Sequence, residues 1–150
     1  MTSWAEFETA APEIAANGRR LLEATGHGSG LLATVQEGSP PRIHPVSVGV
    51  SEGELWVFVL PSPKLTDLIR DRRYALHTLH DPNAPDEFMI RGWARQVDDE
   101  EVRKAVGSQW SFEVDETNTL FALSVESAVF GARGPDEWPP RYTRWSASAG

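Results

Sequence analysis

Apolar and polar residues change their spacing near residue 30 of the chain. Before it, apolar residues recur every three or four positions, as at Phe7, Ala11 and Ile14, which predicts a mainly helical N-terminal segment over residues 1–27. Pro12 lies where a helix can begin, because the first helical turn does not need its missing N–H. The glycine-rich stretch GHGSG then ends the helical pattern.

From residue 31 the pattern is typical of strands joined by tight turns. Three apolar or alternating runs, 31–36, 42–50 and 55–60, are separated by the turn sequences EGSPP and SEGE. They predict an antiparallel meander. Pro45 has no N–H to donate to a neighbouring strand, so its strand is expected to lie at an edge, or to bulge, at that residue.

The second half of the chain continues with strands and two short helices. Strands are expected over 74–81, 87–97 and 119–132, and helices over 63–71 and 98–110. In the first helix we expect Leu65, Leu68 and Ile69 on one apolar face, and Gly92 is predicted to form a bulge. The tail, residues 133–150, is rich in Pro and Gly and is predicted to be irregular.

Six strands, mostly antiparallel, with three short helices favour a mainly β fold. A sheet of this size usually closes, because closure removes exposed strand edges. We therefore expect one domain over residues 1–150, built on a six-stranded antiparallel β-barrel with short flanking helices.

The composition excludes several kinds of protein. The chain has no cysteine, which excludes disulfides, iron–sulfur clusters and thiolate nucleophiles. Its net charge of −8 argues against general nucleic-acid binding. No apolar run approaches the roughly 18 residues of a membrane-spanning helix. We expect a cytoplasmic protein that binds neither nucleic acid nor membrane.

The stretch LPSPKLTDLIRD, residues 60–71, contains one of only two lysines in the chain. Lys64 stands where a helix is expected to begin, just after Ser62 and Pro63. Free N–H groups at a helix start attract anions, and Lys64 adds a full positive charge. Ser62 can cap the helix or bond to a phosphate oxygen. From this stretch alone, a capped helix with an exposed lysine is the simpler interpretation.

A second candidate lies in PPRIHPVSV, residues 40–48. Strand alternation places Arg42 and His44 on one face, and both can donate hydrogen bonds to an anion or a carbonyl. An ordinary solvent-facing strand explains each residue alone. His77 and His80 face opposite sides of a strand and do not predict a metal site. No motif of a known catalytic or nucleotide-binding loop is present, so no catalytic residue is predicted.

Three aromatic residues lie in the tail, Trp138, Tyr142 and Trp145. Disordered segments seldom contain so many aromatic residues exposed to solvent. We expect them to be ordered and packed, either on the barrel or on a neighbouring subunit. Trp145 and Arg144 are also suited to cover a flat, anionic ligand.

The order of these features resembles the pyridoxamine 5′-phosphate oxidase-like family, which has an FMN-binding split barrel. A strand with R-x-H-P-V is followed by LWVFV, then by S-x-K-x-x-x-L opening a helix, and then by Y-A-L. The resemblance covers residues 28 to 130, approximately. It implies a six-stranded Greek-key split β-barrel and a homodimer with FMN in the cleft between subunits.

The resemblance also implies which residues bind the cofactor. Residues 42–47 would run beside the ring and phosphate, two residues of the third strand would flank the ring, and the helix start would hold the phosphate. Glu87 would approach from the partner subunit. The predicted cofactor-binding residues are Arg42, His44, Pro45, Val46, Ser47, Phe58, Val59, Ser62, Lys64, Leu65, Glu87 and Trp145.

Two departures from the family pattern bear on activity. Pro63 stands where members that oxidise pyridoxamine phosphate usually carry an arginine, and Glu87 stands where they favour an amide. Pyridoxamine phosphate is therefore not the expected substrate. The implied function is an FMN-dependent oxidoreductase that transfers hydride to or from an unknown small molecule. A deazaflavin-dependent reductase and a non-catalytic flavin or haem carrier are the alternatives.

Overall fold

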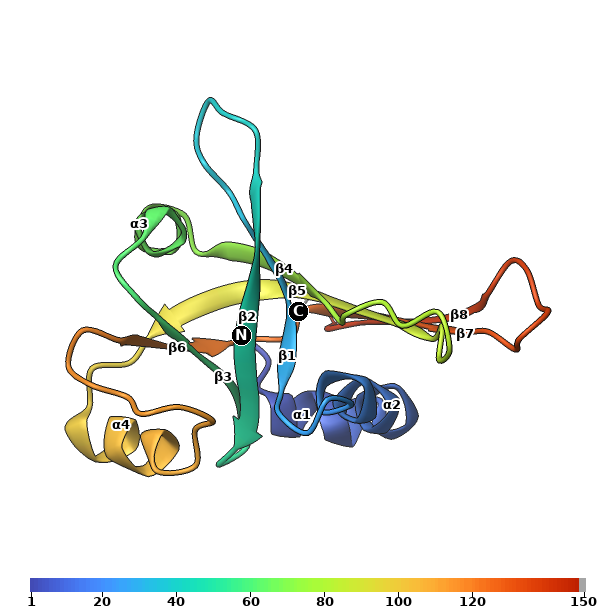
Figure 1. The fold of residues 1–150 in the computed structure, drawn as a ribbon, viewed down its shortest axis with the longest axis horizontal. Helices are drawn as coiled ribbons and strands as arrows, with labels where there is room; N and C mark the ends of the chain where they lie inside the picture. Colours follow the sequence, from blue (N-terminus) through green and yellow to red (C-terminus); the bar gives the residue numbers. More distant parts are fainter. Residues whose placement is uncertain (149–150) are drawn as a thin grey trace.

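The computed structural model describes residues 1–148, which form four short helices and eight strands (Figure 1). The helices are α1 (Trp4–Ala10), α2 (Pro12–Leu22), α3 (Pro63–Arg70) and α4 (Glu100–Gly107). The strands are β1 (Ser29–Thr34), β2 (Arg42–Ser51), β3 (Glu54–Val59), β4 (Arg73–His77), β5 (Glu87–Gln96), β6 (Thr119–Leu123), β7 (Ser127–Ala132) and β8 (Arg141–Ser146).

Strands β1 to β6 close into a barrel. They pair in the order β4-β1-β2-β3-β6-β5, and β5 pairs back to β4. Every one of these pairs is antiparallel. The consecutive strands β4, β5 and β6 lie side by side with β3 next to β6, which is a Greek-key arrangement. The prediction of a mainly β fold with a six-stranded antiparallel barrel is confirmed.

The long strand β5 pairs with two different strands along one of its edges. Its first half pairs with β7 and its last residues pair with β6, so the single strand predicted over 119–132 is two strands. At the junction, residues 92–93 of β5 face three residues, 124–126. The predicted bulge at Gly92 is wrong, because the extra residue lies on the other side. Gly92 instead permits a close approach, since a Cβ there would lie 2.0 Å from the Ser124 carbonyl oxygen.

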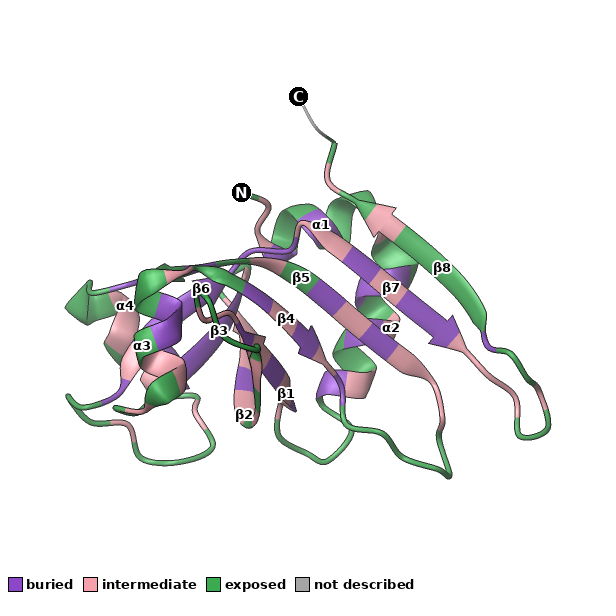
Figure 2. Ribbon diagram, turned by 90° about the horizontal axis from the view of Figure 1, so that it is seen from above, coloured by how far each residue is buried: buried purple, intermediate pink, exposed green. Residues whose placement is uncertain are grey.

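Strands β7 and β8 extend the sheet beyond the barrel. Figure 2 shows α1 and α2 behind this extension, while its opposite face has no helix over it. The prediction of an irregular tail is wrong over β8, because all six of its residues pair with β7. Of the tail aromatics, Trp145 packs on Phe7 with ring centroids 5.0 Å apart. Trp138 and Tyr142 stay 74% and 47% exposed in a single chain, so they do not pack on their own barrel, and packing on a neighbouring subunit stays a prediction for them.

Strand β3 separates two apolar clusters and is buried on both faces. Leu55, Val57 and Val59 face the barrel core. Trp56 and Phe58 face outward and are covered by α4 and the loop that follows it. A strand covered on both faces needs no polar alternation, which explains the uninterrupted run LWVFV. No helix within residues 1–148 is long and apolar enough to cross a membrane.

Candidate functional site

The candidate site lies where α3 meets the beginning of β2, at one end of the barrel. Four of the predicted residues come together here: Arg42 and His44 from β2, and Ser62 and Lys64 from the start of α3. An ion pair links the two elements, with Arg42 Nε 3.0 Å from Asp67 Oδ2. The charges of Lys64, Arg42 and Asp67 all act on the pKa of His44, which places them close to its ring.

The start of α3 is built as the sequence predicts. Ser62 is the N-cap, and its Oγ accepts a hydrogen bond from the Leu65 N–H at 3.4 Å while donating to the Leu60 carbonyl at 2.8 Å. Pro63 occupies the first turn, and that turn contains no acidic residue. Within the described residues the half-buried Lys64 makes no ion pair. The positive end of the helix is therefore open to an anion.

The most buried charge of the site, Asp67, is a residue that the sequence did not single out. It is 2% exposed, and its Oδ2 accepts hydrogen bonds from Thr34 Oγ1 at 2.8 Å and Arg42 Nε at 3.0 Å. The prediction that Ile69 belongs to the buried face of α3 is wrong, since Ile69 is 57% exposed. The helix instead turns Asp67 inward, because Arg42 and Thr34 compensate its charge there.

Arg42 keeps donors available after binding Asp67. Its Nε–H binds Asp67 and its Nη2 donates to Gln36 Oε1 at 2.8 Å. A guanidinium has five N–H donors, so three remain for a ligand. The side chain is 36% exposed, and the free donors can be reached from outside.

His44 adds a neutral polar group to the site. Burial lowers the pKa of His44, and the positive charges of Lys64 and Arg42 lower it further, while Asp67 raises it. The ring is therefore uncharged at neutral pH. Its Nε2 is buried and has no hydrogen-bond partner among the described residues. A buried polar atom without a partner is costly, and a bound ligand would satisfy it.

The rest of the predicted β2 residues border the same end of the barrel. Residues 42–47 pair with β1 alone, because β3 pairs only with residues 48–51. The strand is thus an edge at Pro45, as predicted. Val46 packs against the barrel core, whereas Pro45 is exposed and Ser47 is half-buried on the other face. The free edge offers backbone groups to a ligand.

Phe58 and Val59 lie on opposite faces of β3 and are both buried. Val59 belongs to the barrel core and Phe58 to the cluster under α4. The Phe58 ring meets Trp110 edge to face, with centroids 5.0 Å apart. The structure thus gives Phe58 a packing role that the sequence did not predict.

Glu87 and Trp145 lie at the other end of the chain's sheet, on the extension formed by β5, β7 and β8 (Figure 1). Glu87 Oε2 accepts a hydrogen bond from the Tyr142 hydroxyl at 3.0 Å, and this bond raises the pKa of Tyr142. Trp145 packs on α1. Within one chain neither residue reaches α3, so only a second copy can bring Glu87 to the site.

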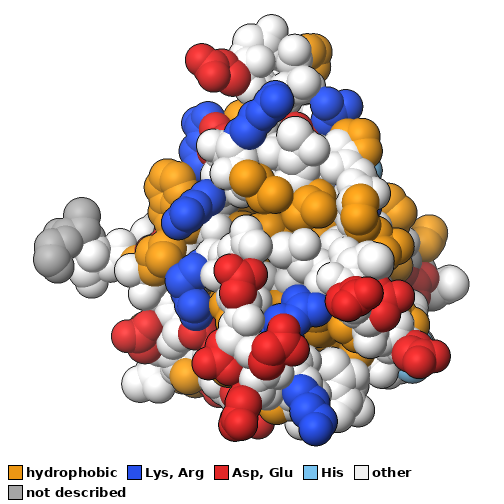
Figure 3. Space-filling model, turned by 90° about the vertical axis from the view of Figure 1, so that its left-hand side faces the viewer, with side chains coloured by type: hydrophobic (Ala, Val, Ile, Leu, Met, Phe, Trp, Pro, Cys, Tyr) orange, Lys and Arg blue, Asp and Glu red, His pale blue; other side chains and the backbone are white. Residues whose placement is uncertain are grey.

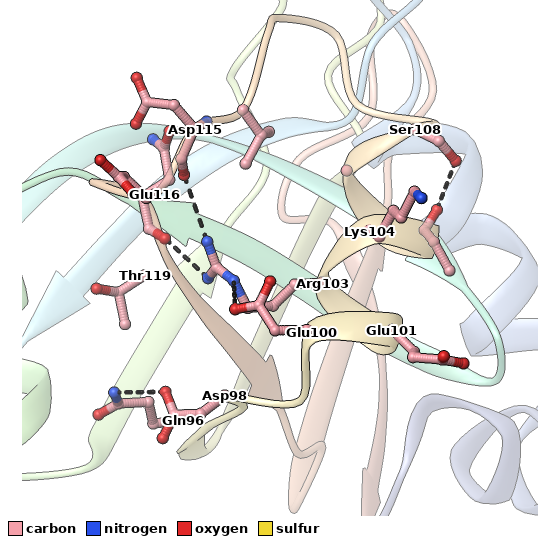
Figure 4. A pocket seen from close by; sticks show the side chains of 14 residues that line it. Gln96, Asp98, Glu100, Glu101, Arg103, Lys104, Ser108, Asp115, Glu116 and Thr119 are labelled. Atoms are coloured by element: carbon pink, nitrogen blue, oxygen red, sulfur yellow. Dashed lines mark hydrogen bonds and ion pairs between the residues drawn. The ribbon is translucent and has the colours of Figure 1, made fainter.

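A hollow of about 1220 Å³ lies beside α4 and the loop that follows it (Figure 4). Arg103 at its centre is engaged by the protein, since it donates to the carbonyls of Asn118 and Asp115 at 2.9 and 3.3 Å. The carboxylates in its lining are those of Asp98, Glu100, Glu101, Asp115 and Glu116. Figure 3 shows acidic side chains gathered in its lower half, where α4 lies, and several basic ones in its upper half, beside α3. The hollow by α4 is thus unsuited to an anion.

Within residues 1–148, no group of three or more His, Asp or Glu side chains is arranged to hold a metal ion. The three other histidines, His27, His77 and His80, therefore belong to no such group in the described part of the chain.

Neither a family model nor a curated protein matches the sequence. Solved structures do match. A putative pyridoxamine 5′-phosphate oxidase from Listeria innocua is 18% identical, with 75% of this chain and 94% of that chain covered and a TM-score of 0.61. An FAD-binding protein from Mesorhizobium loti is 17% identical, with 76% and 91% covered and a TM-score of 0.54.

A haem-binding protein from Mycobacterium smegmatis is 17% identical over 87% of this chain, with a TM-score of 0.62. This chain spans 57% of that protein's length. Identities this low show the fold alone. At that level they confirm the resemblance seen in the order of the sequence motifs: the chain has the split-barrel fold of proteins related to pyridoxamine 5′-phosphate oxidase.

Proposed function

We propose that the protein binds FMN at the end of the barrel and acts as an FMN-dependent oxidoreductase on a small molecule. The observation that carries the proposal is the convergence of Arg42, His44 and Lys64 at the open N-terminus of α3. This convergence provides two positive charges, a helix start without acidic residues and a buried imidazole nitrogen without a partner. Together they fit a phosphate group attached to a larger ligand.

The residues divide between the two ends of the cofactor. Lys64, Ser62 and the free donors of Arg42 would hold the phosphate. The free edge of β2 at residues 42–47 would bond to the edge of the ring, and His44 would contribute its unpaired Nε2. The flavin supplies the hydride chemistry when bound, while the protein orients its ring and neutralises its phosphate. A cytoplasmic location is part of the proposal.

The proposal includes a homodimer. The apolar run in β3 does not support it, because α4 covers that surface within the same chain. Support comes from the uncovered face of the sheet, where a groove of about 510 Å³ is lined by Ala33, Ala75 and Trp93 among others. Trp93 is 44% exposed. A second copy on this face would bury apolar surface and offer its own Glu87 to the cofactor.

The absorption spectrum of the purified protein, and of the small molecule released by heating, tests the cofactor. The matched variants are Lys64→Ala and Lys104→Ala, since Lys104 is the other lysine and lies in α4. A charge-assisted hydrogen bond contributes about 1.5–3 kcal/mol, so Lys64→Ala should weaken FMN binding about 10- to 150-fold. Lys104→Ala should not. Riboflavin, which lacks the phosphate, should bind all three proteins alike. Equal FMN affinity in the wild type and Lys64→Ala would refute the site.

Two alternatives share the same site. A deazaflavin coenzyme also presents a phosphate and a flat ring, and the released molecule's spectrum distinguishes it. The structural likeness to a haem-binding protein favours a non-catalytic carrier as the second candidate. Bleaching of the bound flavin by a reduced nicotinamide would support the oxidoreductase, and a flavin or haem that stays unreduced would support the carrier.

A further inference from the structure

We propose that Asp67 is the positioning residue of the anion site, holding Arg42 and the first turn of α3 in the arrangement in which Arg42 and Lys64 act on one anion. The inference rests on the proposed function only in taking FMN as that anion. It concerns a side chain that would not itself touch the ligand.

The geometry connects three separate elements through one atom. Asp67 Oδ2 accepts from Thr34 Oγ1 in β1 at 2.8 Å and from Arg42 Nε in β2 at 3.0 Å. Asp67 and Lys64 are three residues apart in α3, so their side chains lie on neighbouring parts of one helix face. The carboxylate therefore ties the Arg42 guanidinium to the helix that carries Lys64.

The way Arg42 is held leaves its outer side free. Asp67 takes the Nε–H, and Gln36 Oε1 takes an Nη2 hydrogen at 2.8 Å. A carboxylate bound in the bidentate manner would instead take two parallel N–H groups. The single contact at Nε orients the guanidinium plane while most of its donors stay available.

Asp67 orients Arg42, which an apolar residue at this position would not do. A charge that is only 2% exposed carries a desolvation penalty, and apolar residues often replace buried ion pairs without loss of stability. An apolar residue at this point of α3 would fill the space but leave Arg42 held by Gln36 alone. The negative charge also opposes a bound anion, so its orienting effect must outweigh that repulsion.

Two substitutions separate orientation from charge. Asp67→Asn keeps an oxygen that accepts from Thr34 and Arg42 and removes the repulsion, so it should bind inorganic phosphate and FMN at least as tightly as the wild type. Asp67→Ala removes both contacts and should weaken the binding of each ligand about tenfold. The matched controls are Asp71→Asn and Asp71→Ala, because Asp71 follows α3 and pairs with Arg73 instead of Arg42. They should leave both affinities unchanged.

NMR titration of His44 distinguishes the positioning role from a loss of packing, because it measures the effect of the Asp67 charge on the pKa of His44. Asp67 raises this pKa, whereas Lys64 and Arg42 lower it. Asp67→Asn should lower the pKa of His44 below its wild-type value, and Asp71→Asn should not. This measurement needs no ligand and remains informative if Asp67→Ala fails to fold.

The outcomes distinguish the two proposals. If the protein binds phosphate but not FMN, the proposed function is wrong. The role of Asp67 is then decided by the phosphate affinities of the same variants. Binding of neither ligand would overturn both. If both bind and Asp67→Ala retains wild-type affinity, or if Asp67→Asn is as weak as Asp67→Ala and leaves the His44 pKa unmoved, the positioning role is wrong.

Discussion

Helices α3 and α4 are both eight residues long, yet they use their N-termini in opposite ways. The first turn of α4 contains Glu100 and Glu101, and its N-cap Asp99 accepts two backbone N–H bonds at 2.9 and 3.1 Å. The first turn of α3 has no acidic residue and carries Lys64 instead. The positive helix end is thus neutralised by carboxylates in α4, whereas in α3 no carboxylate of the first turn neutralises it.

The surfaces beside the two helices also differ in their chemistry. Carboxylates line the hollow beside α4, and its central Arg103 is bound to loop carbonyls. The site at α3 has positive groups with free donors. Helix α4 therefore stabilises the barrel by covering β3, whereas α3 is the helix that we propose binds the cofactor phosphate.

Removal of the contact beneath α4 should have the largest effect. Phe58 is 6% exposed and meets Trp110 edge to face, so Phe58→Ala should lower the free energy of unfolding by about 3–5 kcal/mol. Chemical denaturation measures this. If Phe58 instead mainly flanks a flavin ring, FMN affinity would fall and the stability of the ligand-free protein would change little.

Reversal of the charge at the start of α3 should remove the difference between the helices. Lys64→Glu places a carboxylate in that first turn, as in α4, and adds repulsion to the loss of a charged bond. FMN affinity should fall at least about 100-fold, as measured by quenching of flavin fluorescence. Lys104→Glu, which alters charge by the same amount in α4, should cause a far smaller change. Similar losses in both variants would show that overall charge, not the α3 site, controls binding.

The two N-caps should differ moderately in their effect on stability. Asp99 accepts two N–H bonds, whereas Ser62 accepts one at 3.4 Å. Loss of an N-cap costs about 0.5–2 kcal/mol, and Asp99→Ala should lie higher in that range than Ser62→Ala. Calorimetry compares the two. Of the two variants, only Ser62→Ala should also weaken FMN binding. An equal loss of FMN affinity in Asp99→Ala would contradict the assignment of the site to α3.

The smallest effect concerns pH. The pKa of His44 is lowered from its ordinary value of 6.5, so below that value the unfolded chain binds more protons than the folded chain. Stability should therefore fall as the pH decreases from 6.5 toward the lowered pKa. His44→Gln should make the stability less dependent on pH in this window. An unchanged dependence would mean that His44 is not shielded at the mouth of the barrel.

The sequence by itself determined the features that depend on near neighbours. Ser62 and Pro63 start α3 because a cap and a first-turn proline act within one turn. Pro45 marks an edge because it lacks an N–H, whatever surrounds it. The turns EGSPP and SEGE place β1, β2 and β3 in a meander, and the order of motifs indicated the barrel fold.

Only the tertiary structure decided the features that depend on distant partners. Asp67 is buried because Thr34 and Arg42, 33 and 25 residues away in the chain, compensate its carboxylate. Residues 141–146 form a strand because β7 offers a free edge, which outweighs the local Pro and Gly content of the tail. Phe58 is buried on the outside of the barrel because α4 covers it. In each case the free energy that stabilises the arrangement comes from a contact between residues far apart in the sequence.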